Sequence, residues 1–262
     1  MIGPVALLGF ILASACLLMV AVWLFQRQSG DAGIVDLAWA GGIAAAALAA
    51  AILGEGTGAR RALVGAMGAA WGGRLALHLW RRNHGKPEDG RYQELRRVHG
   101  ARVQSFFFAF FQFQAVAIAI FAMPLVIAMR RPDTGLTGWD ALGAVIWMLA
   151  VGGEALSDAQ LERHRRDPAN RGKTCRSGLW RTSRHPNYFF EGLHWFAYVP
   201  IGLTAPWGAL TLAGPALMLF FLYRVTGIPV TEQRAIASRG EDYRRYQRET
   251  SAFIPWFPRS SR

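Results

Sequence analysis

The chain has 262 residues, of which 52% are hydrophobic, and it carries 29 Lys and Arg against 17 Asp and Glu. Apolar stretches of about 20 residues recur along its length, which excludes a water-soluble globular domain and indicates an integral membrane protein. The net charge of +12 does not indicate nucleic-acid binding, because no DNA- or RNA-binding motif accompanies the basic residues.

The apolar stretches predict seven membrane-spanning helices, because backbone groups in lipid must form their hydrogen bonds within their own segment. We therefore expect an all-α fold, a seven-transmembrane-helix bundle that forms a single integral membrane domain over residues 1–262. The predicted spans cover residues 4–25, 33–53, 62–80, 105–129, 138–158, 187–204 and 206–226.

The basic residues predict the orientation of the chain. The connections after spans one, three and five, together with the tail, hold 23 of the 29 basic residues, and the opposite connections hold four. Because positive loops stay inside, the loops 81–104 and 159–186 and the tail 227–262 are expected in the cytoplasm, with the N-terminus outside. Membrane topology and attraction to anionic lipids explain this bias by themselves. They do not explain why the basic residues are grouped with Gly, Asn and His in two loops, or why 27 of the 29 are Arg, so a phosphate ligand stays open as a second interpretation.

Several ionisable residues fall inside the predicted spans. Burying a charge at the bilayer centre costs at least about 2.5 kcal/mol, so each of them is a candidate functional residue. The alternative is that they pair across helices, Asp36 with Arg74 for example, or extend to the interface. The residues are Asp36, Arg74, His78, Glu154, Asp158, Glu191, His194 and Arg224.

The segment from Arg163 to Tyr198 combines a basic, glycine-containing loop with an aromatic helix, and contains RGKTCRSGLWRTSRHPNYFFEGLHWFAY. We interpret this segment as a binding site for a phosphate-bearing cofactor at the surface of the membrane. No Walker motif, GxGxxG motif or metal-ligand cluster is present. Cys16 and Cys175 are expected to be unpaired thiols.

Two patterns favour a packing role. The run SFFFAFFQFQ from Ser105 to Gln114 either borders a flat substrate or faces lipid, and lipid-facing aromatic residues are the commoner case. The glycine pairs are expected to let helix backbones approach closely. These pairs are Gly41-Gly42, Gly72-Gly73 and Gly152-Gly153.

Two C-terminal segments carry a resemblance to a known family. They are SGLWRTSRHPNYFFE from Ser177 to Glu191 and GIPVTEQRAIASRGEDYRRYQRETSAFIPWF from Gly227 to Phe257. Together with NHGKPEDGRYQE from Asn83 to Glu94, they resemble the membrane steroid 5-alpha-reductase family, and most closely its bacterial branch of the DUF1295 type. The superfamily includes the sterol double-bond reductases and, more distantly, the isoprenylcysteine carboxyl methyltransferases.

The resemblance implies a seven-helix bundle in a bacterial inner membrane, whose cytoplasmic loops enclose NADPH beside a steroid-like enone. The loop charges agree with this, because the pyrophosphate and 2'-phosphate of NADPH are anions that Arg and Lys neutralise. The cofactor-binding residues that the resemblance implies are Arg74, Asn83, Lys86, Asp158, Arg165, Lys173, Arg184, His185, Asn187, Tyr188 and Arg224.

Reduction of a conjugated alkene also needs a group that polarises the carbonyl in a dry site. Where the steroid enzymes have a Gln-Glu pair in span two, this chain has Asp36, and Trp71 replaces a tyrosine of span three. Asp36 is therefore predicted to polarise the carbonyl, and Glu191 either to assist it or to hold the nicotinamide amide. The possible partners of Asp36 are His78, Tyr188, Glu191 and His194.

Three functions compete. The first is an NADPH-dependent reductase of a 3-oxo-delta-4 steroid or similar lipid enone. The second is an S-adenosylmethionine-dependent methyltransferase of the isoprenylcysteine type, whose cofactor has no phosphates and gives no reason for Lys86, Arg165 and Lys173. The third is a lipid-binding or scaffold protein, which has no need for ionisable residues inside the bundle.

Overall fold

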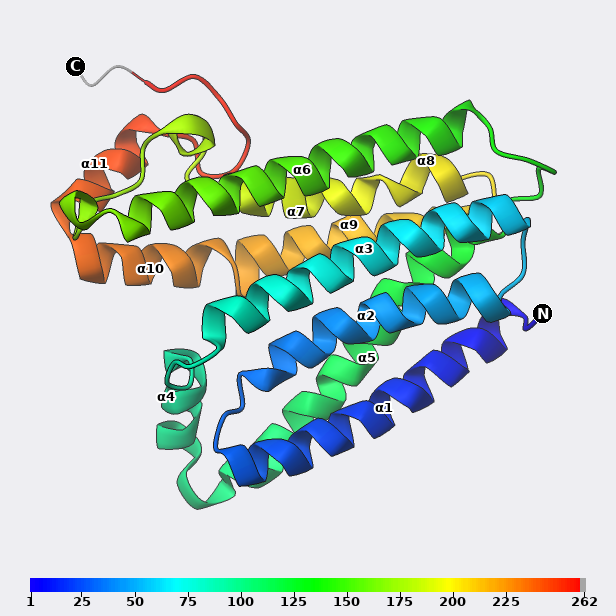
Figure 1. Ribbon diagram of the computed structural model, residues 1–262, viewed down its shortest axis with the longest axis horizontal. Coiled ribbons are helices and arrows are strands. Elements are labelled where there is room, and N and C mark those ends of the chain that lie inside the picture. The colour runs from blue at the N-terminus through cyan, green and yellow to red at the C-terminus, as the bar shows by residue number, and fades with distance from the viewer. Residues whose placement is uncertain (260–262) are drawn as a thin grey trace. The chain divides into compact units, whose positions relative to one another are not determined.

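The structure is a computed structural model, and it describes residues 1–259. Helices follow one another along this range, and its residues form no β-strand, only an isolated bridge between Ile2 and Gly54. The all-α fold is therefore confirmed (Figure 1). The α-helices are α1 (Pro4–Ser29), α2 (Ile34–Leu53), α3 (Gly58–Asn83), α4 (Gly90–His99), α5 (Val103–Met129), α6 (Gly138–Arg166), α7 (Pro186–Phe196), α8 (Tyr198–Gly202), α9 (Ala213–Phe220), α10 (Ile228–Arg239) and α11 (Glu241–Glu249).

Five helical segments of the described chain are long and apolar enough to cross a membrane. α3 is not among them because Arg74, His78 and several glycines lower its hydropathy. The structure thus supports an integral membrane protein, and the count of seven spans stays a prediction. The five segments are Pro4–Ser29, Ile34–Leu53, Gly90–Met129, Gly138–Arg166 and Gly208–Arg239.

The predicted sixth span, residues 187–204, is not one continuous helix. α7 ends at Phe196 and the short α8 begins at Tyr198. Pro200 has no N–H to donate to the carbonyl of Phe196, so the regular hydrogen-bond ladder stops there.

The predicted seventh span, residues 206–226, is also divided. A 3-10 turn (Gly208–Leu212) leads into α9, and a π-helical turn (Phe221–Val225) follows it. In this turn the amide N–H groups of Thr226 and Gly227 both donate to the carbonyl of Phe221, at 3.0 and 3.3 Å. A Cβ on Gly227 would lie 2.3 Å from the carbonyl oxygen of Leu222, so the turn requires glycine.

The described chain forms two compact units. The first comprises Met1–Asp140 and Tyr198–Thr211, and α1, α2 and α3 run side by side in it (Figure 1). A Cβ on Gly72 would lie 2.7 Å from the carbonyl oxygen of Ala40, and one on Gly42 would lie 2.5 Å from Ile118 of α5. Gly42 and Gly72 therefore have the expected packing role. Their neighbours Gly41 and Gly73 have nothing within 4 Å of a built Cβ.

The aromatic run at the start of α5 is only partly lipid-facing. Phe107 and Phe111 are fully buried, whereas Phe108 and Phe113 are exposed. The guanidinium of Arg96 lies 4.9 Å from the ring centre of Phe107. The expectation of a lipid-facing run is thus wrong for the buried face, because α5 packs against both α1 and α2 with that face.

A buried ion pair lies at the end of the first unit where α3 begins. Arg60 in the first turn of α3 is fully buried, and its Nε and Nη2 donate to the two carboxylate oxygens of Asp140 at 2.7 and 3.1 Å. The same guanidinium donates to the backbone carbonyls of Arg131 and Gly135 at 2.9 and 2.6 Å. Every charge is therefore compensated by several hydrogen bonds, as a buried pair requires.

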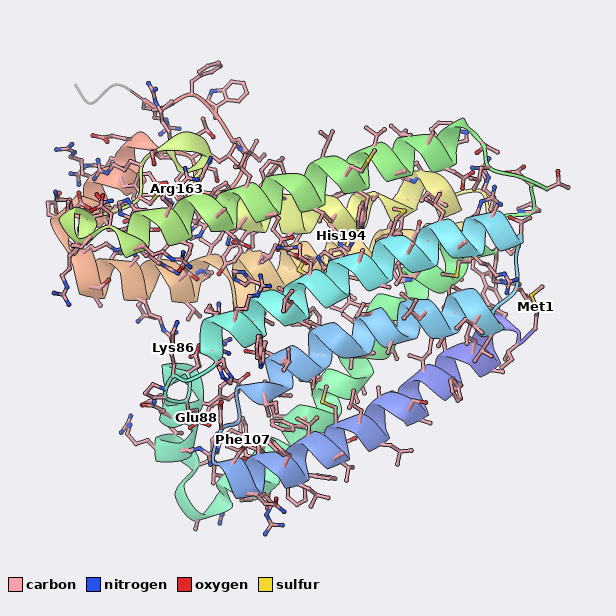
Figure 2. All side chains as sticks on the ribbon, in the orientation of Figure 1. Met1, Lys86, Glu88, Phe107, Arg163 and His194 are labelled. Carbon is pink, nitrogen blue, oxygen red and sulfur yellow. The ribbon has the colours of Figure 1, made fainter. Side chains whose placement is uncertain are left out.

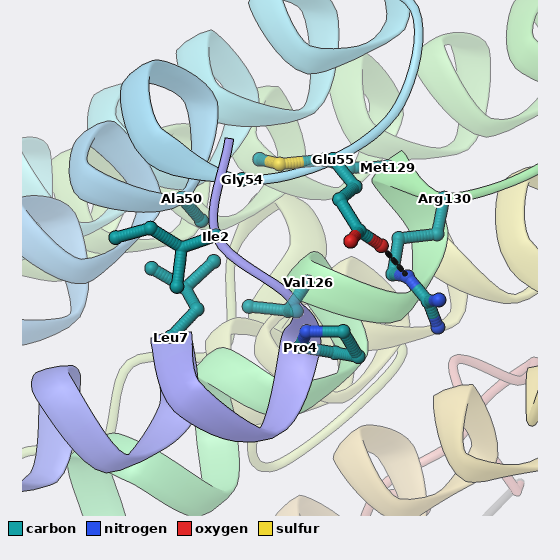
Figure 3. A pocket seen from close by; sticks show the side chains of 9 residues that line it. All are labelled: Ile2, Pro4, Leu7, Ala50, Gly54, Glu55, Val126, Met129 and Arg130. Atoms are coloured by element: carbon teal, nitrogen blue, oxygen red, sulfur yellow. Dashed lines mark hydrogen bonds and ion pairs between the residues drawn. The ribbon is translucent and has the colours of Figure 1, made fainter.

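A small hollow lies at this end of the first unit (Figure 3). Apolar side chains such as Ile2, Leu7 and Val126 line it, and an ion pair of 3.1 Å between Glu55 and Arg130 borders it. These side chains leave no room between them for even a water molecule. The hollow therefore does not hold a dinucleotide.

The second unit comprises Ala141–Ala197 and Leu212–Arg262, described to Arg259. α7 packs against α9, and α10 packs against α11. A Cβ on Gly153 of α6 would lie 2.4 Å from the ring of Phe190, so this glycine lets α7 approach closely, whereas Gly152 faces open space. The tyrosines of α11, Tyr243 and Tyr246, form the small core between α10 and α11 together with Ala235.

Candidate functional site

The turn after α3 presents Lys86. Asn83 is the last residue of α3, and its carbonyl accepts a hydrogen bond of 3.0 Å from the amide of Lys86. Gly85 has a φ of +71°, a left-handed backbone conformation that glycine adopts without strain. The Lys86 side chain is exposed and has no ionic partner among residues 1–259, so its ammonium group is available to an anionic ligand (Figure 2).

Asp36 lies in the first turn of α2 and accepts two hydrogen bonds. The hydroxyl of Tyr92 donates to Oδ1 and Nη2 of Arg91 donates to Oδ2, both at 2.8 Å. Asp36 therefore pairs with Arg91 of α4. The pair of Asp36 with Arg74, which the sequence analysis gave as an example of pairing across helices, is not formed. Both of its oxygens are occupied as acceptors, which holds α4 against the start of α2.

The acidic residues of the α3–α4 connection neutralise much of its positive charge. Glu88 accepts from the amide of Ala32 at 2.7 Å and from Nε of Arg96 at 2.9 Å. Asp89 caps α4 by accepting from the amide of Arg91 at 2.8 Å. This connection consequently offers fewer free cations than its composition indicated.

An aromatic cluster lies one helical turn from Asp36. Trp39 of α2 makes edge-to-face contacts with Trp71 and Phe121, with ring centres 6.3 and 5.7 Å apart. Its indole Nε1 is buried and has no hydrogen-bond partner among the described residues. A buried donor without an acceptor is a signal of a ligand or water. Arg74 and His78 lie one turn apart on α3 and are half-buried.

In the second unit, the RHPNY segment is tied to the tail by Arg184. Nε of Arg184 donates to Oε1 of Glu232 at 2.6 Å, and Nη1 donates to the carbonyls of Gln247 and Thr250 at 3.0 and 2.6 Å. The amide of Arg184 also donates to the carbonyl of Ser251 at 2.8 Å. Arg184 is thus fully engaged in joining α7 to α10 and α11.

His185 immediately precedes α7, and its ring bonds to Glu232 as Arg184 does. Its Nε2 lies 3.2 Å from Oε1 of Glu232, and its ring stacks on Tyr188 with 5.3 Å between the ring centres. Burial lowers the pKa of His185 by more than the carboxylate of Glu232 raises it. The ring is therefore neutral at pH 7 and acts as a hydrogen-bond donor to Glu232.

The tyrosines of the tail signature have structural contacts. The hydroxyl of Tyr246 donates to the carbonyls of Trp180 and Ser183, the latter at 3.0 Å. The hydroxyl of Tyr243 donates to Glu232 at 3.4 Å. Burial raises the pKa of both hydroxyl groups, so they remain protonated donors. The tail signature therefore folds against the RHPNY segment.

A second ion-pair group fixes the loop before the RHPNY segment. Asp242 accepts from the amide of Thr174 and from Nη2 of Arg176, both at 2.8 Å, and Arg176 also pairs with Glu249 at 3.2 Å. Burial raises the pKa of Asp242, but the hydrogen bonds of Thr174 and the charge of Arg176 outweigh it and lower the pKa. This carboxylate is accordingly charged in the folded protein.

Three predicted site residues of α6 and α7, Asp158, Asn187 and Glu191, are partly or fully buried. Nδ2 of the Asn187 side chain donates to Oδ1 of Asp158 at 3.3 Å. Oδ1 of the same side chain accepts from the backbone amide of Tyr188 at 3.0 Å. Glu191 is 9% exposed and accepts from the indole of Trp195 at 3.4 Å. The first of these contacts brings Asp158 and Asn187 together, and their assignment to a cofactor stays a prediction.

Three predicted cofactor residues of the second unit are exposed. Arg165 lies in the last turn of α6, Lys173 in the loop after it and Arg224 in the π-helical turn. The ammonium group of Lys173 has no carboxylate partner within the described range. Single π-helical turns are frequent at functional sites, which favours a role for Arg224.

A family model with the description "Protein of unknown function (DUF1295)" matches residues 22–250, which is most of the chain. The chain belongs to the DUF1295 family. This family is associated with steroid 5-alpha-reductase-like proteins. No curated protein and no solved structure gives a significant match.

The predicted site residues of this DUF1295 protein belong to both units. The first unit holds Asp36, Arg74, His78, Asn83 and Lys86, and the second holds the others. Two residues that sequence reasoning gave no role also belong to these networks. Glu232 is one of four acids in the tail 227–262, and Trp39 follows Asp36 by one turn, so the sequence alone does not single out either residue.

Proposed function

We propose that this DUF1295 protein is an NADPH-dependent reductase of a conjugated C=C bond in a 3-oxo-delta-4 steroid or similar lipid enone. Its partners in this proposal are a lipid-like substrate and the surrounding membrane lipids. The observation that carries the proposal concerns Lys86 and Lys173, the two lysines of the chain. Both are exposed in basic connections in which several of the arginines are paired with acids.

Exposed lysines without acidic partners fit a ligand with phosphate groups. Arg91, Arg96, Arg176 and Arg184 already bond to carboxylates within the protein. Lys86 and Lys173 have no such partner in residues 1–259, so they are among the cations that a pyrophosphate or a 2'-phosphate would neutralise. S-adenosylmethionine has no phosphate and leaves both without an explanation.

When bound, NADPH supplies the reducing equivalent, and the protein contributes binding, orientation and polarisation. Asn187 and Asp158 offer amide and carboxylate oxygens, and Arg224 offers a guanidinium at the π-helical turn. Arg184 and His185, which bond to Glu232, hold the RHPNY segment in place for these contacts. Arg165 is exposed and completes the set of basic groups in the second unit.

Polarisation of the substrate carbonyl is assigned to groups around Asp36 and to Glu191. In one role, Asp36 separates from Arg91, takes up a proton and donates a hydrogen bond to the substrate carbonyl. In the other role, the carboxylate of Asp36 orients the hydroxyl of Tyr92. The buried indole N–H of Trp39 is a further donor close by in the chain. One preorganised donor in a dry site is worth about 2.7 to 4 kcal/mol to such a reaction.

The proposal includes a topology of seven spans, with α3 and the α7–α8 pair added to the five apolar segments. The N-terminus then lies outside, and the basic loops and the C-terminus lie in the cytoplasm of a bacterium, where they enclose the cofactor. The distribution of positive charge supports this orientation. The glycine contacts of Gly72 support α3 as a packed member of the bundle, because small residues let membrane helices approach.

The second candidate function is a methyltransferase of the isoprenylcysteine type that uses S-adenosylmethionine. The RHPNY segment and the tail signature are shared with that class. Their contacts through Arg184, Glu232 and Tyr246 serve to fix the tail and are compatible with either cofactor.

An activity screen tests the proposal. The protein purified in detergent is incubated with NADPH and a panel of steroid, fatty and isoprenoid enones, and absorbance of NADPH and product mass are followed. We expect consumption of NADPH with a gain of two hydrogens in at least one enone. Transfer of a methyl group from S-adenosylmethionine to an isoprenylcysteine, with all enones unchanged, contradicts it.

A further inference from the structure

The segment after α11 follows a fixed course over the second unit. The hydroxyl of Ser183 donates to the carbonyl of Phe253 at 2.8 Å, and the amide of Trp256 donates to the carbonyl of Thr182 at 2.9 Å. The amide of Arg259 donates to the carbonyl of Glu249 at 2.8 Å. These three hydrogen bonds hold the segment from Phe253 to Arg259 against the rest of the second unit.

The apolar side chains of this segment divide into one buried anchor and three exposed residues. Phe253 is buried, with its ring centre 5.7 Å from that of Phe189 and 4.9 Å from that of Tyr223. Ile254, Trp256 and Phe257 are 59%, 68% and 82% exposed. Large apolar side chains gathered on an exposed segment mark an interaction surface.

The surroundings of the segment indicate lipid as its partner. Tyr223, which contacts Phe253, is exposed and belongs to the apolar segment Gly208–Arg239 that is able to cross a membrane. The tail therefore adjoins a segment that is apolar and long enough to cross a membrane. Arg181 and Arg259 are exposed and have no carboxylate partner in the described residues, so they complement anionic headgroups.

We propose that Ile254, Trp256 and Phe257 insert into the interfacial region of an anionic bilayer and anchor the tail there. Aromatic residues flanked by basic residues are favoured at this depth, because their rings are apolar and the headgroups are charged. The anchor holds Phe253 against α7 and so keeps the RHPNY segment and the tail together. The proposal does not depend on the reaction that the protein catalyses.

Photoactivatable phospholipid tests this contact in the unmodified protein. The full chain is reconstituted in nanodiscs of phosphatidylcholine and phosphatidylglycerol, irradiated and digested with trypsin, which releases Glu249–Arg259 as one peptide. We expect lipid adducts on residues 254–257 of that peptide. A peptide without adducts, in a sample whose α1 peptides are modified, overturns the proposal.

Fluorescence at single cysteines locates the side chain directly. The natural cysteines, Cys16 and Cys175, are both free as the sequence predicted, and alanine replaces them. An environment-sensitive dye on Phe257→Cys is compared with the same dye on Glu241→Cys, since Glu241 is exposed on α11. We expect spin-labelled lipid to quench position 257 and aqueous iodide to quench position 241. Equal quenching of both by iodide contradicts insertion, and protection of 257 from both quenchers indicates a protein partner instead.

Discussion

Nε of Arg184 lies 2.6 Å from Oε1 of Glu232, and this ion pair joins two segments that are 48 positions apart in the chain. His185, Tyr243 and Gln247 bond to the same carboxylate. The RHPNY segment and the tail signature are therefore two halves of one structural element. Their joint presence in the sequence has a physical reason, because each supplies the partners that the other needs.

The substitution Glu232→Gln tests this element. It keeps the size of the side chain and removes the charge that Arg184 and His185 share, so a mostly buried guanidinium loses its ionic partner. We expect a loss of about 1 to 3 kcal/mol of stability, less than for a fully buried pair because both side chains retain some exposure. The apparent melting temperature in detergent measures this loss.

Glu241→Gln is the matched control, because Glu241 pairs with Arg248 where both side chains are largely exposed. Its melting temperature should stay close to that of the wild type, since surface ion pairs contribute little. Equal shifts of the two variants would show that Glu232 has no special structural role.

The pH dependence of stability should reveal His185. Because its folded-state pKa lies below the usual value of 6.5, the unfolded chain binds the proton more readily. Its contribution is complete above about pH 6.5 and is lost as the pH falls through the lowered pKa. We expect the melting temperature to fall from about pH 7 to about pH 5, and the substitution His185→Gln to flatten this decline.

His84→Gln serves as the control, because His84 is exposed in the turn after α3. This variant should keep the decline of the wild type. If the melting temperature of His185→Gln still falls with pH as in the wild type, and that of His84→Gln does not, protonation of His185 is not the cause of the fall.

The sequence predicted the apolar helices well and the polar contacts poorly. The predicted spans match α1, α2, α5 and α6, because an apolar segment in a membrane satisfies its backbone hydrogen bonds by forming a helix. The pairing of Asp36 with Arg91 was missed, since 55 positions separate the two residues and many arginines compete for one acid. The break between α7 and α8 follows from Pro200, a local signal that the uniform hydropathy of the segment concealed.

The pair of Arg60 and Asp140 should dominate the stability of its end of the first unit. Arg60→Met leaves the buried carboxylate of Asp140 without its guanidinium, and we expect a loss of about 3 to 5 kcal/mol. The double variant Arg60→Met with Asp140→Leu should regain part of this loss, because it removes both charges. Melting temperatures of the single and double variants measure the coupling, and strictly additive losses contradict it.

Asp36 should affect turnover more than cofactor affinity. Asp36→Asn retains a hydrogen-bond acceptor for Tyr92 but removes the charge opposite Arg91. We expect kcat to fall by at least about tenfold, equivalent to about 1.4 kcal/mol of transition-state stabilisation, with little change in the Kd for NADPH. An unchanged kcat removes Asp36 from the mechanism.

Tyr92→Phe separates the two roles considered for Asp36. It removes the hydroxyl and leaves the ion pair with Arg91 in place. A loss of kcat as large as that of Asp36→Asn indicates that Asp36 acts through Tyr92. A wild-type kcat in Tyr92→Phe assigns the polarising role to Asp36 itself.

Removal of Lys86 should weaken phosphate binding. A charge-assisted hydrogen bond contributes about 1.5 to 3 kcal/mol, so Lys86→Ala should raise the Kd for NADPH roughly ten- to hundredfold. A smaller effect on NADH places Lys86 at the 2'-phosphate, and equal effects place it at the pyrophosphate. Lys173→Ala is tested in the same way.

Arg97→Ala is the control for both lysine variants, because Arg97 is exposed and paired with Glu94. Its Kd for NADPH should match that of the wild type. If all three variants bind NADPH equally well, the lysines have no part in cofactor binding.

Ligand-induced stabilisation tests the proposed cofactor most directly. The melting temperature of the full chain in detergent is measured with increasing NADPH and, separately, with increasing S-adenosylmethionine. A ligand at 100 times its Kd stabilises the folded state by about 2.7 kcal/mol, so a rise with NADPH alone is the predicted result. A rise with S-adenosylmethionine alone, and none with NADPH, would contradict the assignment.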